Sequence, residues 1–80
     1  MPQYPRQAKA AELEGVVVLK IIVLADGSVS KIEVVEGEEP FVSAATRAVK
    51  EWHYRPAQED GQAIAVYHTV RIPFTLEDEG

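Results

Sequence analysis

The segment from Ala63 to Leu76 alternates between two sets of side chains along its whole length. The mostly apolar parity comprises Ile64, Val66, His68, Val70, Ile72, Phe74 and Leu76, and the other comprises Tyr67, Thr69, Arg71, Pro73 and Thr75. A period of two predicts a strand that buries one face. Proline has no N–H to donate to a sheet, so Pro73 predicts that at least one side of this strand is unpaired. We therefore expect an edge strand.

The segment Val16 to Leu24 is apolar on both parities, with Lys20 as its one charge. A strand that is apolar on both faces is typical of the middle of a sheet. The dipeptide Asp26-Gly27 follows directly and predicts a tight hairpin turn, because both residues tolerate positive φ angles. This segment is therefore expected to be the central strand, paired with the strand that comes next.

The next predicted strand runs from Val29 to Glu36, with Ile32 and Val34 as expected core positions. The alternation slips near Ser30-Lys31, which predicts a break in the pairing register. Charged residues protect a sheet edge against unwanted pairing. We expect this second edge to be protected by Lys31, Glu33 and Glu36.

Two helices are predicted. The first covers residues 5–13: Pro5 suits a first helical position, Gly15 ends the segment, and Tyr4 is the expected anchor. The second covers residues 40–53, and Pro56 stops it. Helical spacing of apolar residues defines its buried stripe, which comprises Phe41, Ala45, Ala48 and Trp52. The residues from Gln58 to Gly61 are expected to form a polar turn that leads into the last strand.

Together these elements predict one α+β domain over residues 1–80, with the topology α-β-β-α-β. The sheet is expected to be three-stranded and antiparallel, in the order second-first-third, with both helices on one face. At about 3.3 Å per residue, the central strand spans about 30 Å and the last strand about 46 Å, so the last strand must extend past its neighbour. Its outer edge carries Arg71 as its only full charge, and such an edge recruits a partner strand or aggregates.

The composition limits the class of partner. The net charge is −5 and the eight Lys and Arg residues are scattered, which argues against nucleic acid, because a surface that binds phosphates needs clustered cations. The absence of cysteine excludes disulfides and thiolate metal sites and leaves the compartment open. The most apolar stretch, Val16 to Ala25, is too short for a membrane helix, which needs about 20 residues.

The sequence offers no catalytic, cofactor-binding or metal-binding motif. There is no glycine-rich phosphate loop, and the two histidines, His53 and His68, are isolated from other ligands. Neither Ser28 nor Ser43 has a histidine at a spacing known for nucleophilic catalysis. The acidic residues near Glu38 are explained by a solvated helix start. We therefore predict a chain that is not an enzyme and has no catalytic residues, cofactor or metal.

Several short motifs, taken in order, resemble the carboxy-terminal domain of TonB-family energy transducers. The resemblance extends from Gln3 to Leu76, nearly the whole chain. It rests on Gln3-Tyr4-Pro5 before the first helix, Glu14-Gly15 before the central strand, Asp26-Gly27-Ser28-Val29 at the hairpin, Trp52-His53-Tyr54-Arg55-Pro56 after the main helix, and Ile72-Pro73-Phe74 in the last strand.

The resemblance implies a fold like that of the TonB and TolA carboxy-terminal domains, located in the periplasm. It also implies an inner-membrane anchor and a proline-rich linker upstream, an ExbB/ExbD-type proton channel as inner-membrane partner, and coupling of proton-motive force to nutrient uptake. The target would be an outer-membrane transporter for iron chelates or vitamin B12, whose extended Ton box adds as a strand beside the domain's last strand.

Carried onto this chain, the resemblance implies a partner-binding site in two parts. Met1 stands where the family motif often has a further glutamine, and Pro73 lacks one donor, which shifts the expected pairing toward Tyr67 to Arg71. The implied site residues are Gln3, Tyr4 and Pro5 in the first part and Tyr67, His68, Thr69, Val70, Arg71, Ile72, Phe74 and Thr75 in the second.

Two other interpretations stay open. The same fold serves as a structural or signalling module in a TolA-like protein, or pairs with its own copy as a strand-swapped homodimer. Val16, Val18 and Ile22 are expected on the sheet face away from the helices, where they are more apolar than a solvated face needs, and they would fit self-association or cover by another segment. A small enzyme of acylphosphatase-like shape would need a phosphate-binding loop with Arg and Asn, and the chain contains no Asn.

Overall fold

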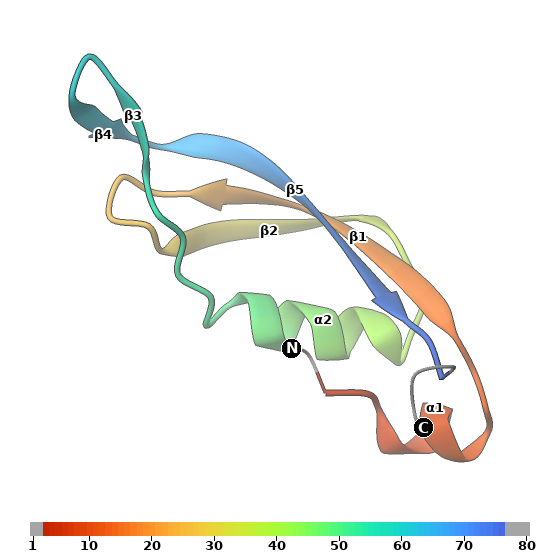
Figure 1. The fold of residues 1–80 in the computed structure, drawn as a ribbon. Coiled ribbons are helices and arrows are strands. Elements are labelled where there is room, and N and C mark those ends of the chain that lie inside the picture. The colour runs from red at the N-terminus through yellow and green to blue at the C-terminus, as the bar shows by residue number, and fades with distance from the viewer. Residues whose placement is uncertain (1–2, 77–80) are drawn as a thin grey trace.

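The computed structural model describes residues 3–76 and is built around a three-stranded antiparallel sheet. The central strand β1 (Gly15–Val23) lies between β2 (Val29–Glu36) and β5 (Val66–Phe74), as Figure 1 shows. The β1–β5 pairing runs without a break from Gly15 opposite Phe74 to Val23 opposite Val66. This arrangement confirms the predicted α+β class and the order second-first-last.

The pairing of β1 with β2 is irregular at two places. Ser30 is an extra residue between the partners of Ile22 and Val23, which confirms the predicted slip in register. Val35 is a second extra residue, which the alternation did not reveal. The prediction of Val34 as a core residue is wrong: its side chain is 46% exposed, because it lies on the outer strand at this second bulge.

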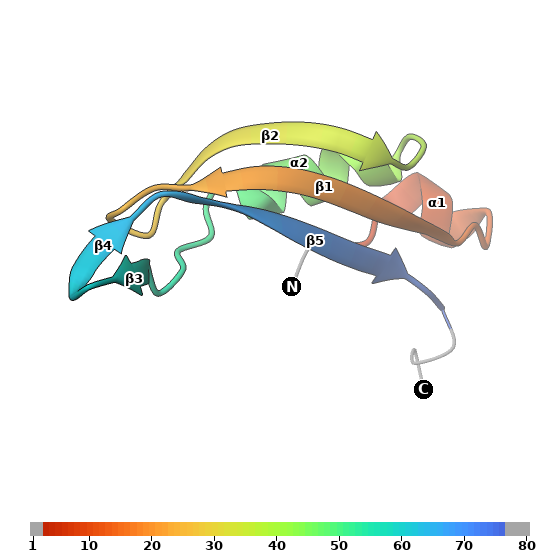
Figure 2. The ribbon, with the colours of Figure 1, turned by 90° about the horizontal axis from the view of Figure 1, so that it is seen from above.

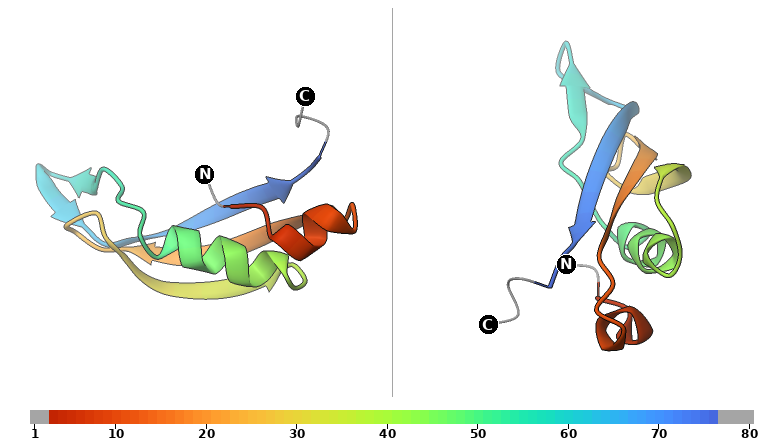
Figure 3. Two further views of the ribbon diagram at one scale, coloured as in Figure 1. Left: turned by 90° about the horizontal axis from the view of Figure 1, so that it is seen from below. Right: turned by 90° about the vertical axis from the view of Figure 1, so that its right-hand side faces the viewer.

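Both helices, α1 (Arg6–Ala10) and α2 (Phe41–Val49), cover the same face of the sheet (Figures 2 and 3). Alternation along β1 points every second side chain at them, and fully burying one such side chain stabilises the fold by about 1.5–3 kcal/mol. The buried core comprises Ala8 of α1, Val17, Leu19, Ile21 and Val23 of β1, Phe41, Ala45 and Val49 of α2, and Val70, Ile72 and Phe74 of β5.

Both helices are shorter than the sequence predicts. The first ends at Ala10 instead of residue 13, because Glu12 adopts a positive φ of 56° and the Leu13 side chain, 48% exposed, contributes little to the core. The second ends at Val49 instead of residue 53. Beyond Val49 the chain leaves the helix and lies against the β1–β2 turn, where the Tyr54 N–H donates to the Gly27 carbonyl at 2.8 Å.

The predicted strand 63–76 is in fact two strands, β4 (Gln62–Ile64) and β5. A further strand, β3 (Ala57–Glu59), pairs with β4 through a turn at Asp60 and Gly61, which have φ angles of 53° and 81°. Positive φ at both central turn residues is typical of a tight hairpin. Residues 58–59, expected in a polar turn, therefore form a strand, and the predicted extension past β1 is paired within its own hairpin.

Candidate functional site

The outer edge of β5 is the candidate site, because within residues 3–76 β5 has β1 as its only neighbour in the sheet. Successive residues of a strand direct their N–H and C=O groups alternately to the two sides. The Leu24 N–H donates to the Ser28 carbonyl at 2.9 Å, on the β2 side. The main-chain N–H and C=O groups of even-numbered residues of β1 therefore point toward β2, and those of odd-numbered residues point toward β5. Because Leu19 is paired with Val70, the even-numbered residues of β5 bond to β1.

Two further observations also indicate that even-numbered residues of β5 bond to β1 and odd-numbered residues point outward. The N–H of Leu76, an even-numbered residue, donates to the Glu14 carboxylate at 2.8 Å, next to the start of β1. Pro73 falls among the outward-facing residues, where an edge strand tolerates proline. The outward main-chain donors of β5 thus belong to Tyr67, Thr69 and Arg71, spaced about 7 Å apart.

Both ends of this open edge have structural limits. At the N-terminal end β3 lies on the side of the β4–β5 ribbon that faces away from β1, as Figures 2 and 3 show. A strand added there would meet β3, so the free part of the edge begins at Val66. At the C-terminal end Pro73 has a carbonyl but no N–H. The outward donors therefore lie between these two limits.

On the face of the sheet without helices, the edge presents exposed side chains. Tyr67 is 69% exposed, and the Lys20 ammonium lies 4.8 Å from the centre of its ring. Such a cation–π contact contributes about 0.5–1 kcal/mol at an exposed site. Thr69, Arg71 and Thr75 are also exposed. An added strand would therefore find a mixed aromatic and cationic surface on this side.

On the helix face, the site residues predicted from the sequence divide into two groups. His68 lies on the parity expected for the core, but it is exposed, with its ring 5.2 Å from the Tyr54 ring. Burial raises the pKa of the Tyr54 hydroxyl. The side chains of Val70, Ile72 and Phe74 are buried, and their main-chain groups face β1. These three residues therefore support the edge from within.

The N-terminal segment lies next to the C-terminal end of β5. The Tyr4 ring meets those of Phe41 and Phe74 edge-on, each with centroids 5.7 Å apart, and the Tyr4 hydroxyl donates to the Leu13 carbonyl. Edge-on aromatic pairs contribute about 0.5–1.5 kcal/mol beyond burial. Tyr4 thus fixes the segment in place, with Gln3 exposed and Pro5 half-buried beside it. The two parts of the predicted site therefore meet at this end of β5.

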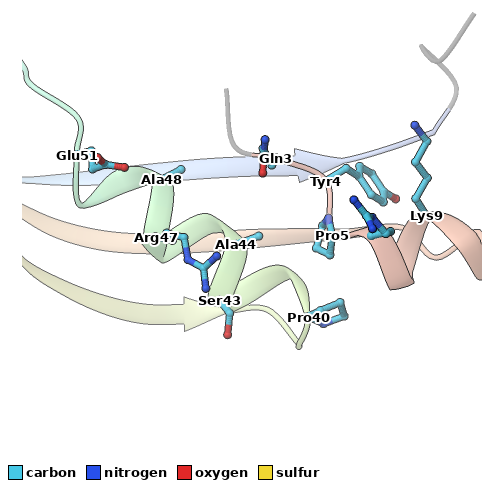
Figure 4. Close-up of a pocket in the computed structure, with 11 residues that line it drawn as sticks. Gln3, Tyr4, Pro5, Lys9, Pro40, Ser43, Ala44, Arg47, Ala48 and Glu51 are labelled. Carbon is cyan, nitrogen blue, oxygen red and sulfur yellow. The ribbon is translucent and has the colours of Figure 1, made fainter.

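Sequence reasoning missed a groove between this N-terminal segment and α2, shown in Figure 4. The groove has a volume of about 820 Å³. Arg6 and Arg47 line it from opposite sides, and no local motif reveals that two residues so far apart in the sequence share one groove. Its walls are Gln3, Tyr4, Pro5, Arg6 and Lys9 on one side and Pro40, Ser43, Ala44, Arg47, Ala48 and Glu51 on the other.

Residues 3–76 contain neither a membrane-spanning helix nor a cluster of metal ligands. None of the helices formed by these residues is long and apolar enough to span a membrane. Nor do these residues bring three or more His, Asp or Glu side chains together as metal ligands.

Comparison with known proteins gives consistent matches. The family described as "Gram-negative bacterial TonB protein C-terminal" matches residues 1–76. Protein tonB2 of Pseudomonas aeruginosa is 40% identical over 77 residues, covering 94% of this chain and 28% of that protein. TonB of Escherichia coli is 32% identical over 78 residues, covering 95% of this chain and 32% of that protein. The chain thus spans about a third or less of the length of these relatives.

Solved structures agree with the sequence matches. The solution structure of the Pseudomonas aeruginosa TonB carboxy-terminal domain superposes with a TM-score of 0.83 at 29% identity, covering 98% of this chain and 81% of that one. The TonB2 protein of Vibrio anguillarum superposes with a TM-score of 0.73 at 33% identity, covering 94% and 74%.

Proposed function

Since the chain belongs to the family of Gram-negative TonB carboxy-terminal domains, we propose that it is the transporter-engaging domain of a TonB-type energy transducer. In this role the open edge of β5 binds an extended segment, the Ton box, of an outer-membrane transporter as one more strand. The observation that carries the proposal is the row of outward main-chain groups at Tyr67, Thr69 and Arg71.

The energetics of such an edge suit a reversible contact. Three outward residues offer three N–H and three C=O groups, and each hydrogen bond contributes about 0.5–1.5 kcal/mol net. At about 1 kcal/mol each, six bonds give about 6 kcal/mol before the entropic cost of association, which corresponds to a dissociation constant of tens of micromolar or weaker. The transducer would bind its transporter, pull and release. Bonds that lie side by side along one edge share such a load.

Membership of the family supports the setting that we propose for this function. The domain works in the periplasm, its inner-membrane partner is an ExbB/ExbD-type complex that supplies energy from the proton-motive force, and the transported nutrient is a compound such as an iron chelate. The domain binds and transmits force, and no catalysis, cofactor or metal takes part.

Amide NMR with an extended peptide of Ton-box type tests the proposal. We expect shifts concentrated between Val66 and Thr75, with the chain remaining monomeric by light scattering. A dimeric chain whose shifts do not respond to millimolar peptide would overturn the proposal in favour of a self-pairing module.

A further inference from the structure

The groove between the N-terminal segment and α2 has an unusual charge for this protein. Among residues 3–76, its lining has three cations, Arg6, Lys9 and Arg47, and one carboxylate, Glu51. Within residues 3–76, neither guanidinium group makes an ion pair or a side-chain hydrogen bond. A guanidinium group offers several N–H donors in a planar fork that matches a carboxylate. The groove therefore suits an anionic ligand.

The positive charge of this groove differs from the negative charge of the rest of the chain. The chain carries a net charge of −5. A second groove, near the start of β1, is lined by four carboxylates, Glu14, Glu36, Glu38 and Glu39, and by no cation from the described residues 3–76. An acidic ligand would be repelled there and attracted to the groove that contains Arg6 and Arg47. Charge complementarity thus selects both the ligand class and the place.

The shape of the groove suits a polypeptide. Ala44 and Ala48 lie one helical turn apart on α2, half-buried, and their small side chains allow a backbone to approach closely. Pro5 and Pro40 contribute rigid apolar walls. The volume of about 820 Å³ lies in the range of about 300–1,000 Å³ that is typical of clefts for drug-sized ligands, and a few side chains of a peptide are of this size.

The groove also adjoins the open edge of β5. Tyr4 lines the groove and at the same time packs edge-on against Phe74, the last residue of β5. Figure 4 shows Tyr4 and Pro5 on one side of the groove and Arg47 and Ala44 on the other. A peptide paired with the C-terminal part of the edge therefore ends close to the groove.

We propose that this groove binds an acidic stretch of the same partner chain whose neighbouring residues add as a strand to β5. The inference rests on the proposed function and specifies the partner further: its edge-binding segment is flanked by several Asp or Glu residues. The carboxylates pair with Arg6 and Arg47, while strand addition supplies the main-chain bonds.

Peptides of defined composition test this proposal on the intact chain. One probe is a nine-residue Thr/Val strand peptide, and two others carry the same strand with a Gly-Ser spacer and four glutamates at either the N- or the C-terminus. We expect one acidic peptide to bind about fivefold tighter than the plain strand at low salt, since exposed ion pairs are individually weak. The gain should disappear at 0.5 M NaCl, because salt screens exposed charges.

Matched variants assign the effect to the groove. Arg6→Gln with Arg47→Gln should remove the gain and leave binding of the plain strand unchanged. The control, Arg55→Gln with Lys31→Gln, removes the same charge from exposed residues that do not line the groove and should keep the gain. A gain that is absent from both acidic peptides, or that survives the loss of both arginines, overturns the proposal.

The test separates this inference from the proposed function. If the plain strand does not bind, the edge proposal fails, and tetraglutamate alone then tests the groove. Salt-dependent shifts at Ser43 to Glu51 would still support an anion-binding groove, and their absence would overturn it.

Discussion

The substitution Thr69→Pro removes the central outward donor of the β5 edge and should spare the fold. Thr69 lies opposite Lys20 at a position whose N–H points away from β1. Proline at this position takes no hydrogen bond from the β1–β5 pairing, and Pro73 already occupies an equivalent position in the same strand. The preceding residue, His68, is in extended backbone, which a following proline favours.

The expected loss of peptide affinity can be worked from the edge. One hydrogen bond contributes about 0.5–1.5 kcal/mol, a factor of about 2 to 12 in the dissociation constant. Because Thr69 is the middle of three outward donors, its loss also divides the remaining bonds into two short groups. We therefore expect Thr69→Pro to weaken binding about tenfold, while Thr69→Ala, which keeps the N–H, changes it less than threefold.

The neighbouring substitution Val70→Pro provides the structural control. The Val70 N–H faces β1, where it pairs with Leu19, and its side chain belongs to the core. Leaving a buried carbonyl unpaired costs about 1–3 kcal/mol, so Val70→Pro should lower stability clearly and lose binding with the fold. Calorimetry with the peptide and thermal melts by circular dichroism measure both effects. If Thr69→Pro unfolds the chain, or binds peptide as tightly as the unmodified chain, the assignment of outward groups is wrong.

Three further predictions concern the supports of the edge. Gly27→Ala should destabilise the fold by about 2 kcal/mol or more in urea melts, because φ is +90° and a Cβ would lie 2.1 Å from the Tyr54 carbonyl oxygen; an unchanged midpoint would contradict this packing. Tyr4→Phe, which loses the bond to the Leu13 carbonyl, should cost about 1 kcal/mol, less than Tyr4→Ala, which also loses the contacts with Phe74; equal costs would argue against the ring contacts. The pKa of Tyr54 is raised by burial, so the stability that it contributes is fully present below its unfolded pKa of about 10 and is lost as the pH rises through the folded value. Urea melts between pH 8 and 11 should show this loss, and it should be smaller in Tyr54→Phe.

The sheet could be predicted from the sequence because its determinants are local. The apolar character of both parities in Val16 to Leu24 marks the central strand, and Pro73 within an alternating segment marks an edge. These signals come from single residues and from the two-residue alternation of a strand, so they do not depend on which segments pack beside it. The hairpin at Asp26-Gly27 is equally local.

The features that were missed depend on contacts between distant or unpatterned segments. Ala57 to Glu59 has no apolar alternation, and it forms β3 only because the Asp60-Gly61 turn brings it against β4. The groove was missed for the same kind of reason, since Arg6 and Arg47 line one groove only after both helices pack on the sheet. Charge scattered along the sequence is therefore gathered by the fold.

Amide hydrogen exchange along β5 tests the central claim most directly. In the free monomeric chain, the amides of Tyr67, Thr69 and Arg71 should exchange rapidly while those of His68, Val70 and Ile72 are protected by β1. Saturating extended peptide should slow exchange at the first three and leave the others as they were. Protection of Tyr67, Thr69 and Arg71 in the free monomer, or no gain on peptide binding, would contradict an edge that binds its partner by strand addition.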